Sequence, residues 1–127
     1  ETMAKYLLVQ GPHFGVITGH GGTWLKALNM GVVGGILAVA NFATELTLDV
    51  ARLAMAAQEP EASEAQRRLT PLALEIVGRM GIPAVKVAME RVGLHGGPVR
   101  LPLLDSSPAD AAQVAELLKE ASVAVVS

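Results

Sequence analysis

The segment from His13 to Asn41 contains two apolar runs of strand length, separated by a short helix and glycine-rich turns. The first run, Phe14–Thr18, is rich in β-branched residues, and the second covers Val32–Ala40. Between them, Trp24–Met30 has room for two helical turns. Because both runs are apolar along their whole length and a helix joins them, this pattern predicts a parallel strand–helix–strand unit.

The two predicted strands end at Thr18–Gly22 and at Ala40–Asn41, where function is expected in parallel α/β proteins. A sheet of only two parallel strands leaves both outer edges unpaired. Its apolar faces also need further strands and helices to cover them. The chain is therefore predicted to be the end of a larger α/β protein, or to assemble with a partner that supplies the missing strands.

The composition is apolar for a small domain, with 51% hydrophobic and 17% charged residues in a chain of 127. A net charge of −2 and 3% aromatic residues give no reason to expect a nucleic-acid partner. The absence of cysteine excludes disulfides, thiolate metal sites and a thiol nucleophile. The longest apolar stretch, Val32–Phe42, is too short to span a bilayer, and no signal peptide is visible, so we expect a cytoplasmic protein.

Helices are predicted on both sides of the strand–helix–strand unit. Residues 1–9 form one helical pattern, and Thr44 is the expected N-cap of a helix that continues to about Gln58. A loop is then expected at residues 59–61, followed by a helix capped by Ser63.

The remaining sequence predicts further helices and one extended segment. Pro71 is expected to kink or restart the helix before it, and Pro83 suits the first turn of another helix. Residues 99–104 are predicted to be extended. Ser107, followed by proline, is a strong N-cap signal for a last helix that ends near Ala121.

Four motifs resemble, in order and spacing, the C-terminal part of the dihydrodipicolinate synthase / N-acetylneuraminate lyase family. They are GVITGHGG, GVVGGILAVAN, GIPAVKVAMERVGL and GGPVRLPL. Within this family the chain looks most similar to the 4-hydroxy-2-oxoglutarate aldolase-like branch. The resemblance covers nearly the whole chain and implies an α/β fold, a TIM (β/α)8 barrel followed by a helical C-terminal extension.

The resemblance also implies where the chain lies in that fold. His13–Thr18 would be strand seven and Val32–Ala40 strand eight. Residues 1–57 would then be the last part of the barrel, from the end of helix six through helices seven and eight. Residues 58–127 would be the helical extension. Six strands of the barrel would lie on the N-terminal side, which answers the problem of the open sheet.

The family is implied to consist of class I aldolases and lyases. A lysine at the end of strand six forms a Schiff base with pyruvate or another 2-oxo acid, assisted by a strand-five tyrosine and a threonine-rich loop. None of these groups lies in this chain, and the lysine is expected just upstream of Glu1. Lys5, Lys26, Lys86 and Lys119 all fall on predicted helices. A Schiff-base lysine instead needs a desolvated pocket that lowers its pKa.

Three candidate substrate-binding residues follow from the resemblance, and a fourth, His20, follows from its ionisable side chain. Gly19 matches a family glycine beside the substrate, and Ile36 matches an isoleucine whose main chain lies near the Schiff-base carbon. Asn41 matches the asparagine that closes strand eight. His20, the one ionisable residue on the predicted rim, could bind a carboxylate or move a proton. The alternative is that His20 is a solvated loop residue.

Other motifs favour structural roles. Gly19–Thr23 could be a phosphate cradle at a helix N-terminus, but it lacks the third glycine of a dinucleotide site and a GK[ST] ending. Thr23 is more simply an N-cap. His13 and His95 lie in predicted loops, too far from His20 in sequence to indicate a metal site. Arg100 could bind an anion, but it is rather expected to pair with a carboxylate and fix its loop against the helices.

These observations predict the C-terminal portion of a Schiff-base-forming lyase that acts on pyruvate or another 2-oxo acid and is inactive alone. Its expected partners are the substrate, the N-terminal part of the barrel and further copies in a dimer or tetramer. No metal, other cofactor, nucleic acid or membrane is expected. Two alternatives remain open: a non-catalytic packing or oligomerisation module, and a small phosphate-binding strand–helix–strand protein.

Overall fold

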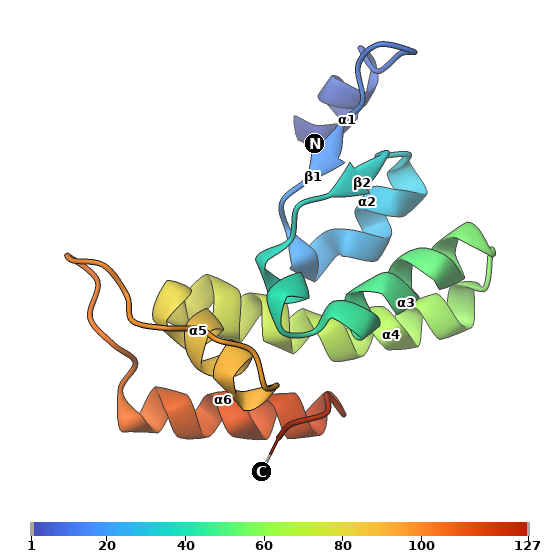
Figure 1. Cartoon of the computed structure of the whole chain (residues 1–127). Helices are drawn as coiled ribbons and strands as arrows, with labels where there is room; N and C mark the ends of the chain where they lie inside the picture. The colour runs from blue at the N-terminus through green and yellow to red at the C-terminus, as the bar shows by residue number, and fades with distance from the viewer. Residues whose placement is uncertain (1, 127) are drawn as a thin grey trace.

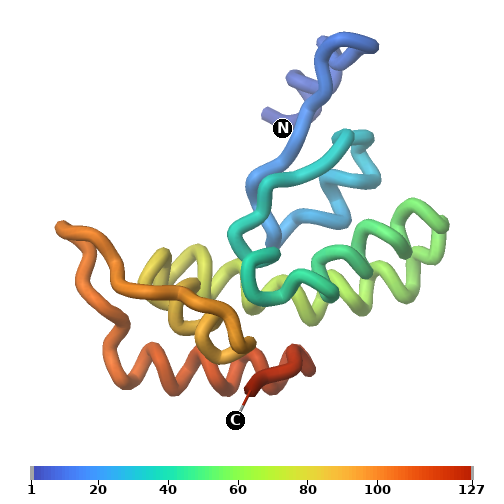
Figure 2. The backbone as a smooth tube through the Cα atoms, viewed as in Figure 1, coloured from blue at the N-terminus to red at the C-terminus, as the bar shows by residue number. Residues whose placement is uncertain are grey.

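The computed structural model describes residues 2–126, which form a mainly helical structure around one short pair of strands (Figure 1). The first helix projects away from the layer made by the later helices, as the backbone trace also shows (Figure 2). In chain order the elements are α1 (Thr2–Leu7), β1 (Ile17–Thr18), the 3₁₀ turn η1 (Gly21–Thr23), α2 (Trp24–Met30), β2 (Gly34–Gly35), the 3₁₀ turn η2 (Ala38–Asn41), α3 (Thr44–Met55), α4 (Glu59–Pro71), the π-helix η3 (Leu72–Met80), α5 (Ile82–Arg91) and α6 (Pro108–Glu120).

Strands β1 and β2 are parallel and are joined through α2. Ile17 pairs with Gly34 and Thr18 with Gly35. The ladder continues beyond the second pair, because the Ile36 N–H donates to the Thr18 carbonyl oxygen at 2.9 Å. The predicted parallel strand–helix–strand unit is therefore confirmed.

Both strands are shorter than the predicted runs of residues 14–18 and 32–40. Gly11 and Phe14 instead pair with each other across a tight turn, and the end of the second run forms η2. Among residues 2–126, β1 and β2 pair only with each other. The ladder therefore covers only part of each predicted run.

The two faces of this sheet differ in what covers them. A Cβ atom built on Gly35 would lie 3.0 Å from the Trp24 ring, so α2 covers that face. A Cβ atom on Gly34 would instead lie 3.9 Å from Ile17, on the opposite face. Ile36, two residues after Gly34, points the same way. Ile17 and Ile36 are 51% and 77% exposed, so this apolar face, called the open face below, lacks a cover in the part of the chain that the structure describes.

The covered face and the later helices share one hydrophobic core. Helices α3 and α4 run side by side in opposite directions, and α6 crosses beneath α5 (Figure 1). The Trp24 indole N–H donates to the Thr47 carbonyl oxygen at 3.1 Å, which links α2 to α3. The largest fully buried side chains come from η2, α3, α4, η3 and α6: Val39, Val50, Leu69, Leu72, Ile76, Val114 and Leu118.

Two predicted helix starts are wrong. Helix α4 begins at Glu59, so the expected loop is its first turn and Ser63 lies inside the helix. Pro60 and the acidic residues around it suit a first helical turn, because proline needs no partner there and carboxylates favour a helix N-terminus. Thr44 is the first residue of α3 rather than its cap, and its hydroxyl donates to the Ala40 carbonyl oxygen at 2.7 Å.

Pro71 changes the helix without ending it. Helix α4 continues directly into η3, where the hydrogen bonds follow the π-helical pattern. Proline lacks the N–H that an α-helix would use at this position, and a local change to π-helix is one of the known consequences of such a disturbance. The predicted kink or restart is therefore realised as a change of helix type.

Other predicted boundaries are confirmed. The Ser107 hydroxyl accepts a hydrogen bond from the Asp110 N–H at 3.1 Å, as an N-cap should. Pro83 lies in the first turn of α5. Residues 99–104, however, contain a turn in place of a continuous extended segment. Within residues 2–126, Arg100 forms no ion pair, so its predicted carboxylate partner is not found.

Candidate functional site

Gly19 follows β1 directly and lies beside the end of β2. A Cβ atom built on Gly19 would be 3.9 Å from the main-chain oxygen of Ile36. The structure therefore brings the main chains of these two predicted substrate-binding residues together. A glycine at this point leaves the backbone free to approach a ligand closely.

His20 is exposed, and its side chain bends back toward the start of α2. The His20 Nδ1 atom lies 3.2 Å from the Thr23 hydroxyl oxygen. Thr23 occupies the N-cap position of α2, but its side chain accepts no hydrogen bond from the helix N–H groups, so the predicted cap is wrong. The hydroxyl contacts His20 in place of the helix end.

A cavity of about 90 Å³, here called the strand-end cavity, lies where the two strands end. The turn after β1 and η2 after β2 supply one part of its lining, and η3 supplies the other. The lining residues are Gly19, His20, Gly21, Ala38, Val39, Ala73, Leu74, Val77 and Gly78. The sequence does not predict the contribution of η3, because its apolar residues give no chemical signal and lie far along the chain from the turn.

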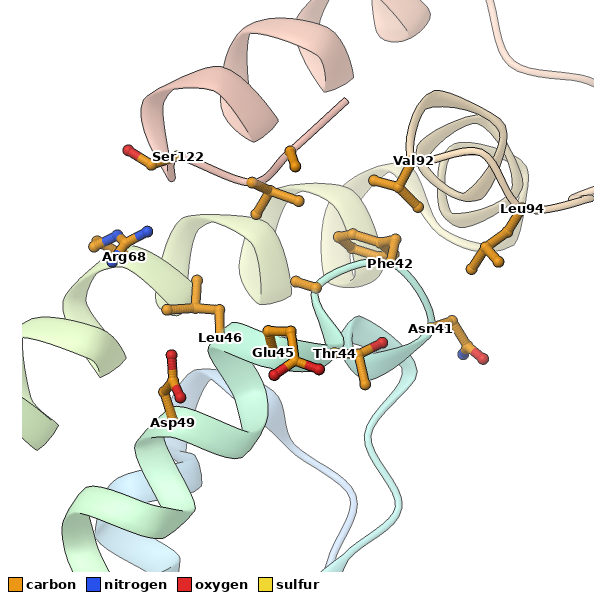
Figure 3. A pocket seen from close by; sticks show the side chains of 13 residues that line it. Asn41, Phe42, Thr44, Glu45, Leu46, Asp49, Arg68, Val92, Leu94 and Ser122 are labelled. Atoms are coloured by element: carbon orange, nitrogen blue, oxygen red, sulfur yellow. The ribbon is translucent and has the colours of Figure 1, made fainter. Parts of the chain in front are cut away.

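Asn41 lies outside the strand-end cavity. Its side-chain amide donates to the Ala38 carbonyl oxygen at 3.0 Å. It lines a different and larger cavity of about 440 Å³, formed by the start of α3, the end of α5 and the C-terminal tail (Figure 3). The four predicted site residues are thus divided: Gly19 and His20 line the strand-end cavity, Ile36 borders it through its main chain, and Asn41 faces the larger cavity.

The charged groups around the larger cavity bind other parts of the same chain. Glu45 and Asp49 both lie near the Arg52 guanidinium, at 3.7 and 3.2 Å. Arg68 donates to the Ala121 carbonyl oxygen at 2.7 Å, which connects α4 to the C-terminal tail. The rest of the wall includes apolar side chains such as Phe42 (Figure 3). Glu45 and Asp49 therefore pair within α3, and Arg68 holds the C-terminal tail against α4.

Among residues 2–126, no lysine side chain lines the strand-end cavity or the larger cavity. Lys5, Lys26 and Lys119 are exposed. Lys86 is half-buried, and its ammonium donates to the Gly96 carbonyl oxygen. The backbone N–H groups of Gly97 and then Gly96 donate to the Glu90 carboxylate, and these hydrogen bonds hold the pKa of the Glu90 carboxyl below its usual value.

Within residues 2–126, no group of three or more histidine, aspartate or glutamate side chains is placed to share a metal ion. In the same part of the chain, every helix is too short or too polar to cross a membrane.

The family model for the dihydrodipicolinate synthetase family matches residues 1–121. A 4-hydroxy-tetrahydrodipicolinate synthase from Acidovorax sp. (strain JS42) is 31% identical over 121 residues, covering 94% of this chain and 41% of that protein. The enzyme of the same name from Methanothrix thermoacetophila is 29% identical over 110 residues, covering 87% of this chain and 37% of that protein. The chain thus spans about two-fifths of the length of these curated relatives.

Solved structures show the same partial match. A Thermus thermophilus protein described as a candidate dihydrodipicolinate synthase superposes with a TM-score of 0.81 at 35% identity, covering 98% of this chain and 44% of that one. YagE, an Escherichia coli prophage protein of the dihydrodipicolinic acid synthase family solved with pyruvate, superposes with a TM-score of 0.75 at 21% identity. It is covered over 39% of its length. The fold is accordingly part of an α/β barrel.

Proposed function

Because the chain belongs to the dihydrodipicolinate synthetase family, we propose that it is the C-terminal portion of a Schiff-base-forming lyase or aldolase. The substrate would be pyruvate or another 2-oxo acid. Two findings support this proposal: the matching curated relatives are synthases of this family, and YagE, a structural neighbour, was solved with pyruvate. The assignment of the chain to the 4-hydroxy-2-oxoglutarate aldolase-like branch stays a prediction.

The observation that carries the proposal is the open face. Its apolar residues Ile17 and Ile36 are 51% and 77% exposed, and both strands have an unpaired outer edge among residues 2–126. Unpaired strand edges and exposed apolar faces are unfavourable in water. In our proposal β1 and β2 are strands seven and eight of a barrel, and the six missing strands cover the open face. We call this protein, the chain joined to its proposed N-terminal part, the complete barrel.

The domain division follows from the same proposal. Residues 1–57 would complete the barrel, and residues 58–127 would form the helical extension. A homo-oligomer, dimer or tetramer, is proposed on the same family grounds. The shared hydrophobic core and the contribution of η3 to the strand-end cavity support an extension that is packed firmly onto the barrel end.

The proposed chemistry divides the work between the two parts. A lysine upstream of Glu1 would attack the carbonyl carbon of the 2-oxo acid and lose water, giving an imine that withdraws electrons from the carbon–carbon bond to be cleaved or formed. In this chain, the main chains of Gly19 and Ile36 would border the bound 2-oxo acid. His20 would bind a carboxylate or exchange a proton at the rim, and Asn41 would close the end of strand eight.

Retro-aldol turnover tests this proposal. The complete barrel is expected to cleave a 4-hydroxy-2-oxo acid, whereas the purified 127-residue chain is expected to give no turnover above the buffer rate, because it lacks the reactive lysine. The measurement is the release of 2-oxo acid, followed by a coupled dehydrogenase. Turnover by the 127-residue chain alone, or an inactive complete barrel across a panel of such acids, would contradict it.

A further inference from the structure

A glutamine of the helical extension binds the turn that follows β1. The Gln66 side chain, on α4, accepts a hydrogen bond from the Leu25 N–H at 2.8 Å. The same amide donates to the Gly21 carbonyl oxygen at 3.1 Å. Gln66 is separated from these residues by 41 and 45 positions, so the contact joins two distant parts of the sequence.

This contact replaces a local helix cap. The first N–H groups of a helix have no partner within it, and the Thr23 side chain does not supply one for α2. A side-chain amide can satisfy a donor and an acceptor together, as Gln66 does here. Its orientation is fixed by Thr70, whose hydroxyl oxygen lies 3.0 Å from the Gln66 amide nitrogen and donates to the Gln66 main-chain carbonyl oxygen at 2.8 Å.

The bound turn carries part of the strand-end cavity. Gly21 lines this cavity together with the two residues before it, Gly19 and His20. The helix that carries Gln66 continues without a break into η3, which lines the opposite side. The amide therefore fixes the turn against the same rigid helix that forms the other wall.

We propose that Gln66 is a positioning residue, through which the helical extension sets the geometry of the turn at Gly19–Gly22 beside the substrate. The extension would then act on the reaction through one side chain as well as through packing. This inference rests on the proposed function for its kinetic consequence. The hydrogen bonds that carry it do not depend on that function.

The test compares Gln66→Leu with Gln113→Leu in the complete barrel. Gln113 is exposed on α6, and its side-chain oxygen accepts from Arg79, so it controls for the loss of a surface amide. Gln66→Leu is expected to lower kcat/KM for carbon–carbon bond cleavage about tenfold or more, because small displacements of a substrate-facing turn have large kinetic costs. Borohydride trapping of the pyruvate imine should stay within about twofold, since the lysine lies on another strand.

A second variant separates positioning from folding. Gln66→Glu keeps an acceptor for the Leu25 N–H but loses the donor to Gly21, so its kcat/KM should fall between those of the parent and Gln66→Leu. If Gln66→Leu does not fold, the kcat/KM of Gln66→Glu relative to the parent tests the proposal by itself. A kcat/KM unchanged in the folded variants, with only the melting temperature lowered, would overturn the proposal.

The two proposals fail in different ways. If the parent complete barrel traps no pyruvate, the proposed function fails, and hydrogen exchange of the Leu25 amide in the 127-residue chain decides the role of Gln66. Exchange about tenfold faster in Gln66→Leu than in Gln113→Leu supports positioning of the turn. Equal exchange in the two variants would overturn it.

Discussion

Ile17→Asp is expected to leave the 127-residue chain folded and little changed in stability, but to destabilise the complete barrel strongly. Ile17 lies on the open face and is 51% exposed, so in the chain alone the new carboxylate keeps contact with water and should cost about 1 kcal/mol or less. In the complete barrel the same face becomes interior. A buried, unpaired carboxylate should then lower the free energy of unfolding by about 3 kcal/mol or more.

Ile82→Asp is the matched control for this prediction. Ile82 is 57% exposed, at the start of α5 in the extension, where the barrel strands should not reach. Its replacement should change the stability of the chain and of the complete barrel equally, by about 1 kcal/mol or less. The measurement is urea unfolding of both forms, followed by circular dichroism. Equal effects of Ile17→Asp in the two forms would argue against an interior open face.

Leu72→Ala is expected to lower the free energy of unfolding of the chain by about 2–5 kcal/mol. Leu72 is the first residue of η3 and is completely buried in the core shared by the sheet and the later helices. Truncating it removes apolar contacts and leaves a cavity that neighbouring helices cannot close. The change is therefore expected to destabilise the whole chain rather than one helix.

Leu74→Ala, two residues further along the same helix, provides the comparison. Leu74 is 45% exposed, so its truncation should cost about 1 kcal/mol or less. Both variants are compared by thermal and urea unfolding under the same conditions. Similar losses for Leu72 and Leu74 would show that η3 does not pack as the structure describes.

The strand–helix–strand unit can be predicted because its signals are local. Apolar runs around Ile17 and Gly34, with a helical segment between glycine turns, determine a parallel pair whatever the rest of the protein does. The roles of Ser107 and Pro83 are also predicted correctly, since each acts on the residues next to it. The strand lengths are not predicted correctly, because the ends of the two apolar runs form a tight turn at Gly11–Phe14 and the 3₁₀ turn η2.

The wrong predictions concern helix starts and caps, which here depend on distant contacts or on competing local signals. Serine often begins helices, which favours a cap at Ser63, but Pro60 and its acidic neighbours start α4 earlier. Thr23 occupies the cap position, yet the partner of the α2 N–H group comes from Gln66, 41 residues after Leu25. No pattern in the sequence connects these positions.

The residues of the candidate site also differ in whether the sequence could identify them. Gly19 and Ile36 are candidates through the family resemblance, and the structure brings their main chains together because β2 ends just before Ile36. The wall supplied by η3 is different, because Leu74 and Gly78 carry no chemical signal and reach the turn only through helix packing. The place of Asn41 after the second strand suggests that it joins the site, but η2 directs it to the larger cavity.

The proposed imine chemistry is tested by locating the lysine that forms the imine. The complete barrel is treated with pyruvate and borohydride, digested, and mapped by mass spectrometry. We expect one reduced pyruvate adduct on a lysine upstream of Glu1, and none when the 127-residue chain is treated alone. An adduct on Lys5, Lys26, Lys86 or Lys119, or trapping by the chain alone, would contradict it.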